Sequence, residues 1–246
     1  MADSKGCNMK YIQTQLGKFP YKPQFVYQGI KQIDKAIAFE NLKIVLAILE
    51  KKHVRASVAY GTLLGIIRDG DFIDWDEDID LCVLAEDAEL FKNCLWDLKK
   101  EGFELIRSDR CDHLFSIQRN GEYIDFYIME KISPEIRSDL GDGFVLEKHL
   151  INLSNYPFKD ISIKIPEQYE EYLRLIYGDW KTPVKYANFN LSKFQILKQK
   201  IWTVIKNIPP RSVRVKLLKK HHRKDLDKFL ARCKENNIIL KHLVNY

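Results

Sequence analysis

The chain has 246 residues, 46% of them hydrophobic and 12% aromatic, which is enough to bury the core of one sizeable domain. No apolar run approaches the roughly 20 residues needed to span a bilayer, and the first seven residues lack the apolar core of a secretory signal. The five cysteines include no Cys-x-x-Cys pair, a pattern typical of reduced thiols and not of a disulfide framework or a zinc site. We therefore expect a cytoplasmic protein.

The charge is unevenly distributed along the chain. The net charge is +6, but residues 191–246 hold 15 Lys and Arg against 3 Asp and Glu, whereas the rest of the chain holds 25 against 31. An acidic body with a basic tail favours an anionic surface as the partner of the tail. We expect a body over residues 1–186 and a basic helical C-terminal extension over residues 187–246.

Apolar periodicity predicts the elements in the first part of the chain. In order, they are a helix over about residues 29–52, a strand over 54–60 that ends at a Gly61–Thr62 turn, a strand over 79–84, a helix over 86–100 and a short strand over 103–107.

In the second part, Asn120–Gly121 is the strongest two-residue turn signal and predicts a hairpin. Residues 131–166 are expected to be rich in loops and to end in a strand. The elements of this part are hairpin strands over 113–119 and 122–129, a helix over 167–177 closed by Gly178, and tail helices over 192–206 and 212–236.

Seven carboxylates fall within twelve positions after the Gly61–Thr62 turn. They are Asp69, Asp71, Asp74, Asp76, Glu77, Asp78 and Asp80. Beside the apolar Ile79 and Leu81, so many carboxylates repel one another strongly unless a cation or solvent absorbs the charge. Side chains two apart on a strand share a face, so Asp78 and Asp80 project together and suit Mg²⁺ or Mn²⁺.

Asp125 lies in the second strand of the hairpin, between the apolar Ile124 and Phe126. A carboxylate inside such a strand is costly unless it has a partner. If the hairpin lies beside the strand over 79–84, Asp125 completes a three-carboxylate site as metal ligand, as general base, or as both. Opposite a phosphate-binding glycine turn, this pattern indicates phosphoryl or nucleotidyl transfer.

Other origins of an acidic run fit less well. A solvated acidic loop is disfavoured because the carboxylates enter apolar strands. An EF-hand is excluded because Ile79 or Leu81 stands where the calcium loop requires glycine. A Walker loop is excluded because no Gly-Lys-Ser/Thr follows the glycines.

Several motifs together resemble the signature of the LicD family, which includes bacterial phosphocholine transferases and fukutin-related ribitol-phosphate transferases. The resemblance covers roughly residues 40–185. The motifs are Gly61-Thr62-Leu63-Leu64-Gly65, Arg68, Phe72-Ile73, Trp75-Asp76-Glu77-Asp78-Ile79-Asp80, Tyr123-Ile124-Asp125 and Tyr177-Gly178-Asp179-Trp180-Lys181-Thr182-Pro183.

The resemblance implies an α+β fold, with a nucleotidyltransferase-like catalytic core over residues 1–186 built on a mixed sheet flanked by helices. It also implies metal-dependent transfer of a phospho-alcohol, such as phosphocholine or phosphoribitol, from a CDP-activated donor to a hydroxyl of a cell-surface glycan. A capsule, O-antigen or teichoic-type polymer, lipid-linked or not, is the expected acceptor.

The candidate site residues divide by role. Asp78, Asp80 and Asp125 are expected to hold Mg²⁺ or Mn²⁺, and Asp125 to deprotonate the acceptor hydroxyl. The donor and its phosphates are expected to contact Gly61, Thr62, Arg68, Asp76 and His113. Four aromatic residues are candidates either for a box around a quaternary ammonium such as choline or for ordinary core packing: Trp75, Trp180, Tyr123 and Tyr127.

Two alternatives to this function stay open. The first is a nucleotidyltransferase that leaves NMP on a small molecule or protein, and the second is a non-catalytic scaffold whose tail binds membrane or nucleic acid. For residues 191–246 we expect docking on an anionic membrane, at the inner face of the plasma membrane. The alternative is that the tail packs on the core. Nucleic acid is the less favoured partner.

Overall fold

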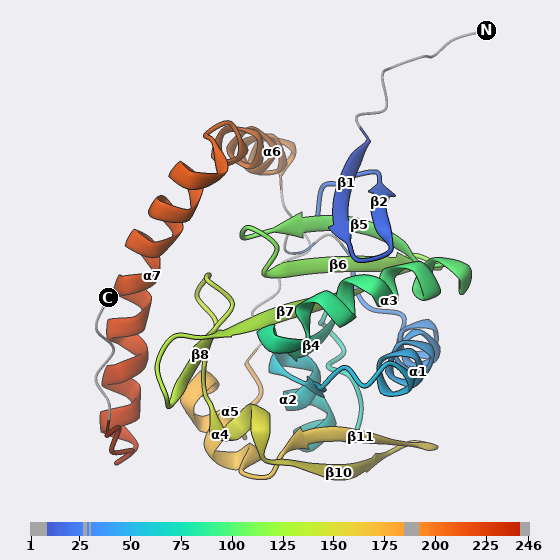
Figure 1. The fold of residues 1–246 in the computed structure, drawn as a ribbon. Helices are drawn as coiled ribbons and strands as arrows, with labels where there is room; N and C mark the ends of the chain where they lie inside the picture. Colours follow the sequence, from blue (N-terminus) through green and yellow to red (C-terminus); the bar gives the residue numbers. More distant parts are fainter. Residues whose placement is uncertain (1–8, 27–28, 30, 185–191, 242–246) are drawn as a thin grey trace, which may run out of the picture.

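The computed structural model describes residues 9–26, 29, 31–184 and 192–241 and shows the expected α+β fold, a mixed sheet flanked by helices (Figure 1). Within these residues the main sheet has seven strands in the order β3-β4-β7-β6-β5, with β8 paired to β7 and β9 to β8. The strands are β3 (Ala56–Val58), β4 (Ile79–Leu84), β5 (Glu104–Asp109), β6 (Leu114–Arg119), β7 (Glu122–Lys131), β8 (Ile136–Ser138) and β9 (Phe144–Leu146).

β4 is the strand around which the sheet is built. All six of its residues are buried, and it pairs antiparallel with β3 but parallel with β7. A parallel pair needs a long crossover, which α3 (Ala88–Lys100), β5 and β6 supply. The crossover ends in the predicted hairpin, where Asn120 and Gly121 have φ of 53° and 83°, as a type I′ turn requires.

Helices cover the sheet from two sides. α1 (Lys35–Lys51) and α3 pack against each other and against the sheet, while α2 (Tyr60–Asp69) packs on β4 and α5 (Tyr169–Tyr177). The helix predicted from residue 29 begins only at Lys35, because the Asp34 carboxylate accepts the backbone N–H groups of Ala36 and Ile37 as an N-cap. Ile30, which the prediction included, lies outside the described residues.

The structure of the body differs from the sequence-based expectations in three places. The strand predicted over 54–60 is shortened to β3, and the glycine turn after it is the first turn of α2. The segment 131–166 ends in a strand as predicted, β11 (Ile161–Pro166), but it is not rich in loops, since it also holds β8, β9, α4 (Lys148–Ile151) and β10 (Leu153–Phe158). The hairpin β1 (Lys10–Thr14)–β2 (Gly17–Tyr21) was not predicted, because its two strands are only five residues long.

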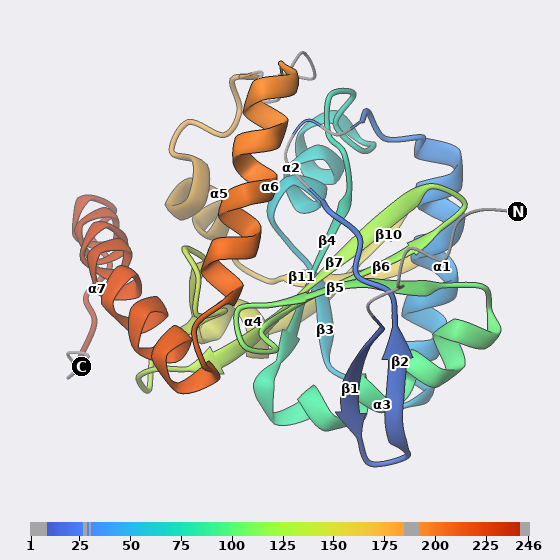
Figure 2. The same ribbon diagram turned by 90° about the horizontal axis from the view of Figure 1, so that it is seen from above.

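The tail forms two helices, as predicted. α6 (Lys193–Asn207) lies at one end of the molecule, and α7 (Arg211–Glu235) runs away from it along the side of the body (Figures 1 and 2). Leu226 and Phe229 of α7 are buried in an apolar cluster with Ile136, Phe144 and Leu175 of the body. The boundary expected at residue 186 falls outside the described residues. No helix of the described chain is long and apolar enough to cross a membrane.

Candidate active site

The register of β4 and β7 brings the predicted carboxylates together. Asp80 pairs directly with Asp125 across the parallel strands, and Asp78 lies two residues ahead, just before β4 begins. Asp80 and Asp125 are 7% and 3% exposed. The expectation that the hairpin lies beside the strand over 79–84 is therefore confirmed, and with it the proximity of the three carboxylates.

The electrostatics of the cluster favour neutralisation by a cation. Burial, followed by the charges of Asp80 and Asp125, raises the pKa of Asp78 well above its usual range. Burial and the charge of Asp76 do the same for the pKa of Asp80, and burial raises the pKa of Asp76 to about 6. A group of hard oxygen donors that repel one another fits Mg²⁺ or Mn²⁺.

Gly61 and Thr62 support the carboxylates from the start of α2. The backbone N–H of Gly61 donates to Asp80 Oδ2 at 3.1 Å, and Thr62 Oγ1 accepts the backbone N–H of Asp80 at 2.8 Å. A Cβ on Gly61 would lie 2.6 Å from Asp76 Oδ2. Gly61 thus lies in the first turn of α2, where the missing side chain leaves room for Asp76, and its contact with donor phosphates stays a prediction.

Asp125 is held by two donors from the neighbouring strands. Ser116 Oγ on β6 donates to Asp125 Oδ1 at 2.5 Å, and Arg107 on β5 forms an ion pair with Asp125 Oδ2. Arg107 Nε also donates to Ser116 Oγ at 2.7 Å. These contacts fix the orientation of the carboxylate at the floor of the site. Neither Arg107 nor Ser116 was predicted, because residues 110–113, which join β5 to β6, contain no glycine or proline to signal a hairpin turn.

Two pockets meet at Asp78. They have volumes of about 780 and 420 Å³. Both are lined by Asp78 and Glu77 and by the aromatic rings of Tyr60, Tyr127 and Tyr177. Two neighbouring pockets that share one acidic wall are the arrangement expected of an enzyme that joins two substrates.

The smaller pocket collects most of the predicted donor-binding residues. Gly61, Arg68 and Asp76 line it together with the metal-binding candidate Asp80, and Arg68 forms an ion pair with Asp69 at 2.7 Å. Trp75 and Trp180 also line it with Tyr127 and Tyr177, so three of the four aromatic box candidates meet there. Tyr123, the fourth candidate, lines the larger pocket.

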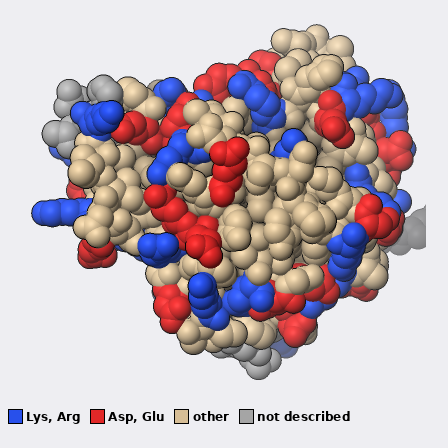
Figure 3. Space-filling model, turned by 90° about the horizontal axis from the view of Figure 1, so that it is seen from below, with Lys and Arg blue, Asp and Glu red and all other residues tan. Residues whose placement is uncertain are grey.

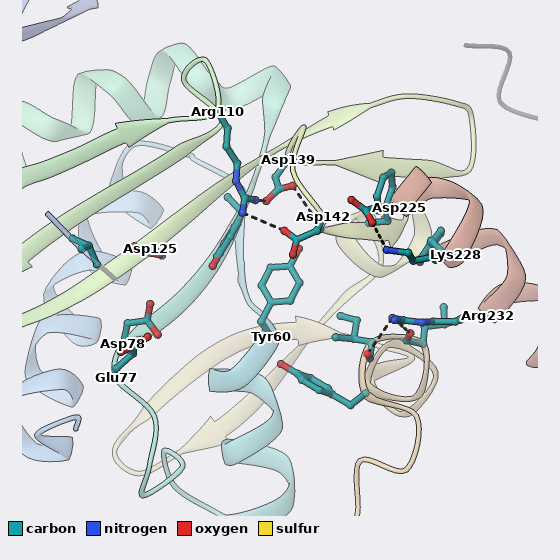
Figure 4. A pocket seen from close by; sticks show the side chains of 18 of the residues that line it. Tyr60, Glu77, Asp78, Arg110, Asp125, Asp139, Asp142, Asp225, Lys228 and Arg232 are labelled. Atoms are coloured by element: carbon teal, nitrogen blue, oxygen red, sulfur yellow. Dashed lines mark hydrogen bonds and ion pairs between the residues drawn. The ribbon is translucent and has the colours of Figure 1, made fainter. Parts of the chain in front are cut away.

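The larger pocket extends from the carboxylates to α7, as Figure 4 shows. Arg110 forms ion pairs with Asp139 and Asp142 in the loop between β8 and β9. The backbone N–H groups of Gly141 and Gly143 donate to Asp139 Oδ1 at 2.8 and 3.2 Å. Sequence reasoning missed this loop, although its Asp139-Leu140-Gly141-Asp142-Gly143 composition is typical of a tight polar turn.

α7 supplies the outer wall of the larger pocket. Lys228 and Arg232 lie opposite Asp78 and Asp125, with Tyr60 between the two sides (Figure 4), and Phe229 also lines the pocket. Lys228 forms an ion pair with Asp225 at 2.7 Å. The tail is therefore part of the site, a role that the sequence did not predict.

Two predicted site residues lie elsewhere. His113 lines neither pocket, since its Nδ1 lies 3.0 Å from the Arg110 carbonyl and its Nε2 3.2 Å from Glu130. Thr62 is buried and acts through the Asp80 backbone. Among the described residues, no three His, Cys, Asp or Glu side chains form a ready-made metal site. Metal binding by Asp78, Asp80 and Asp125 stays a prediction.

Comparison with known proteins agrees with this geometry. Residues 53–168 match the family model described as the LicD/FKTN/FKRP nucleotidyltransferase domain. This match covers just under half of the chain. It spans β3 to β11 and includes all three carboxylates, so the resemblance drawn from the motifs is confirmed.

Related sequences match more than half of the chain. An uncharacterised protein of Rickettsia typhi, RT0683, is 24% identical over 156 residues, which cover 61% of this chain and 47% of that protein. Ribitol 5-phosphate transferase FKRP of Homo sapiens and that of Mus musculus are each 26% identical over 159 residues, covering 56% of this chain and 30% and 31% of those proteins. The chain thus spans less than half the length of the relatives it matches.

Solved structures with similar coordinates include two antibiotic-modifying proteins. The antibiotic-resistance factor ANT(2″)-Ia has a TM-score of 0.43 at 12% identity, covering 82% of this chain and 99% of that one. The lincosamide adenylyltransferase LnuA has a TM-score of 0.41 at 14% identity, covering 68% and 96%.

Proposed function

We propose that the protein transfers a phospho-alcohol from a CDP-activated donor to a hydroxyl group of a cell-surface glycan. One observation carries the proposal: two pockets meet at Asp78 beside the Asp80–Asp125 pair, within the segment that matches the LicD-type domain. The ribitol 5-phosphate transferases among the relatives support the same reaction class.

The proposal includes Mg²⁺ or Mn²⁺ as cofactor. Asp78 and Asp80 would hold it, with Asp125 as a further ligand, because their crowded oxygens gain most from a divalent charge. When bound, the ion neutralises negative charge on the transferred phosphoryl group.

The chain's own residues divide between the two substrates. The smaller pocket, with Arg68 and its aromatic walls, would take the donor, since a guanidinium pairs with phosphate oxygens. The larger pocket would take the acceptor. Asp125, oriented by Arg107 and Ser116, would accept the proton of the acceptor hydroxyl. The acceptor oxygen then forms a bond to phosphorus as the bond from phosphorus to the CMP oxygen breaks.

The test is incubation of the full chain with a panel of CDP-alcohols and Mg²⁺ or Mn²⁺, following CMP. We expect CMP release from one donor, even by hydrolysis without acceptor. CDP-choline and CDP-ribitol are the first donors to compare, because Trp75, Trp180 and Tyr177 in the smaller pocket favour an ammonium group. Release of pyrophosphate from a nucleoside triphosphate, with no CMP from any CDP-alcohol, would replace the proposal with nucleotidyl transfer.

A further inference from the structure

α6 carries a stripe of large apolar side chains that faces away from the body. The residues recur at three- and four-residue steps, which places them on one side of a helix. They are Phe194, Leu197, Ile201 and Ile205, with Trp202 beside them and Ile208 at the C-cap just past the helix, and their exposed fractions run from 47% to 75%.

α6 is stabilised by its N-terminal cap and by contacts on the side of the helix opposite the apolar stripe. The Ser192 side chain accepts the backbone N–H of Gln195, and the Gln195 side chain accepts the backbone N–H of Ser192, a complete capping box. Ile196 and Gln199 on the other side are half-buried, and the Lys200 ammonium lies 5.6 Å from the ring of Phe25. The apolar stripe is thus presented outward by a formed helix. Soluble surfaces rarely leave such a stripe uncovered.

The charge around the stripe has one sign. Residues 192–224 contain eleven Lys and Arg and no Asp or Glu. The face of the molecule seen in Figure 3, from below and so from the end opposite α6 in Figure 1, has acidic and basic side chains interspersed. The segment that carries the exposed apolar helix is therefore basic and free of acidic residues.

We propose that α6 lies in the interface of an anionic lipid bilayer, with its apolar stripe in the acyl boundary and its lysines at the head groups. An amphipathic helix rich in lysine, with Trp and Phe on the apolar side, is the sequence type that binds in this way. At 15 residues α6 is about 22 Å long, too short to span a bilayer but sufficient to lie along one.

The charge also excludes a second copy of the chain as the preferred occupant. Two α6 stripes brought face to face would place two acid-free basic segments against each other, which costs free energy at ordinary ionic strength. Anionic lipid instead gains from the same charges, about fivefold in binding for each basic residue near the surface.

The sequence predicted that the whole tail, residues 191–246, docks on a membrane. We restrict the docking segment to α6 and the start of α7. The second half of α7 is fixed on the body by Leu226 and Phe229, and Lys228 and Arg232 point into the larger pocket instead of toward a membrane. This inference does not depend on the proposed reaction, since it concerns where the protein lies and not what it transfers.

The test is co-sedimentation of the full chain with vesicles of phosphatidylcholine containing phosphatidylglycerol and with vesicles of phosphatidylcholine alone. We expect binding to the first type only, weakened by salt. Ile201→Glu should lower the bound fraction by about tenfold or more, because it removes apolar area and adds repulsion. Ile239→Glu is the matched control: Ile239 is 87% exposed and lies beyond the end of α7, so binding should not change.

A second readout places the helix at the lipid. Trp202→Phe should leave vesicle binding intact but remove most of the vesicle-induced blue shift in tryptophan emission, since Trp75, Trp96 and Trp180 are partly buried against the core. Equal binding to both vesicle types, no binding to either, or equal loss with Ile239→Glu would overturn the proposal. So would a concentration-dependent dimer that Ile201→Glu dissolves, because the stripe would then be an interface between copies.

Discussion

Two glycines on α2 are constrained by different neighbours. A Cβ on Gly65 would lie 2.7 Å from the backbone oxygen of Asp71 and 2.8 Å from the backbone nitrogen of Ile73. A Cβ on Gly61 would meet the end of the Asp76 side chain, which can rotate away. Gly65→Ala should therefore lower the free energy of unfolding by about 1–3 kcal/mol, and Gly61→Ala by much less.

Gly61→Ala, the more stable of the two variants, should be the less active one. Displacing Asp76 disturbs the carboxylates of the site directly, so Gly61→Ala should lose donor turnover while its urea midpoint stays near that of the parent chain. Gly65→Ala, assayed at a temperature where it is folded, should keep more activity than Gly61→Ala. Urea unfolding and CMP release check the pair, and equal stabilities would contradict the assignment of the close contacts to backbone and side chain.

Asp78 should destabilise the protein before it binds a cation. Burial and neighbouring charge raise its pKa, so the ionised form, which the unfolded chain carries at neutral pH, is disfavoured in the folded state. Asp78→Asn should then raise the melting temperature without metal, abolish the rise caused by Mg²⁺ or Mn²⁺, and abolish turnover.

Asp227→Asn is the matched control, because Asp227 is exposed on α7 and lines neither pocket. It should behave like the parent chain in all three measurements, made by calorimetry with and without metal and by CMP release. Full metal-induced stabilisation of the Asp78→Asn variant would remove Asp78 from the proposed metal site.

At the scale of elements, α7 is expected to act as a wall of the acceptor pocket. Lys228→Ala removes a cation from this wall, whereas Lys234→Ala removes one from the exposed surface of the same helix. Once a donor and acceptor pair is known, Lys228→Ala should raise the acceptor KM by about tenfold, the usual cost of one charged hydrogen bond, and leave acceptor-free CMP release unchanged. Equal KM values for the two variants would restrict α7 to a structural role.

The elements that sequence reasoning found share a strong local signal. β4, α3 and the β6–β7 hairpin have long apolar runs, helical periodicity or the Asn120–Gly121 turn. β8 and β9 have three residues each, too few to show a period of two, so their segment resembles a loop. α2 was missed because glycines at positions 61 and 65 indicate a turn, whereas here they permit close packing.

At the scale of the whole molecule, the sequence predicted only those site residues that are neighbours in the sequence or are joined by one strand pairing. Asp78 directly precedes β4 and Asp80 lies in it, and Asp125 follows from a single strand pairing. The contacts of Arg110 with Asp139 and of Ser138 with His222 join residues 29 and 84 positions apart, and no periodicity predicts them. The matched domain, residues 53–168, therefore contains the carboxylates but not α7, which closes the larger pocket.

The pH dependence of global stability should report a buried histidine that joins two helices. His149 on α4 is 1% exposed, and its Nε2 lies 2.9 Å from the Glu171 carboxylate on α5. Burial lowers the pKa of His149 from 6.5 to about 4, although Glu171 opposes the shift. Within the described chain, Nδ1 has no hydrogen-bond partner, so a proton added there is unsatisfied.

Because the folded pKa lies below the unfolded one, the unfolded chain binds more protons between about pH 6.5 and pH 4. The contribution of His149 to stability is complete above this window and falls as the pH drops through it, by at most about 3 kcal/mol. His149→Gln, which keeps a donor for Glu171 but does not titrate, should flatten the curve of unfolding free energy in urea between pH 7 and pH 4.5. His221→Gln, at an exposed position of α7, is the matched control. An identical slope for His149→Gln and the parent chain would show that His149 is not the group that titrates.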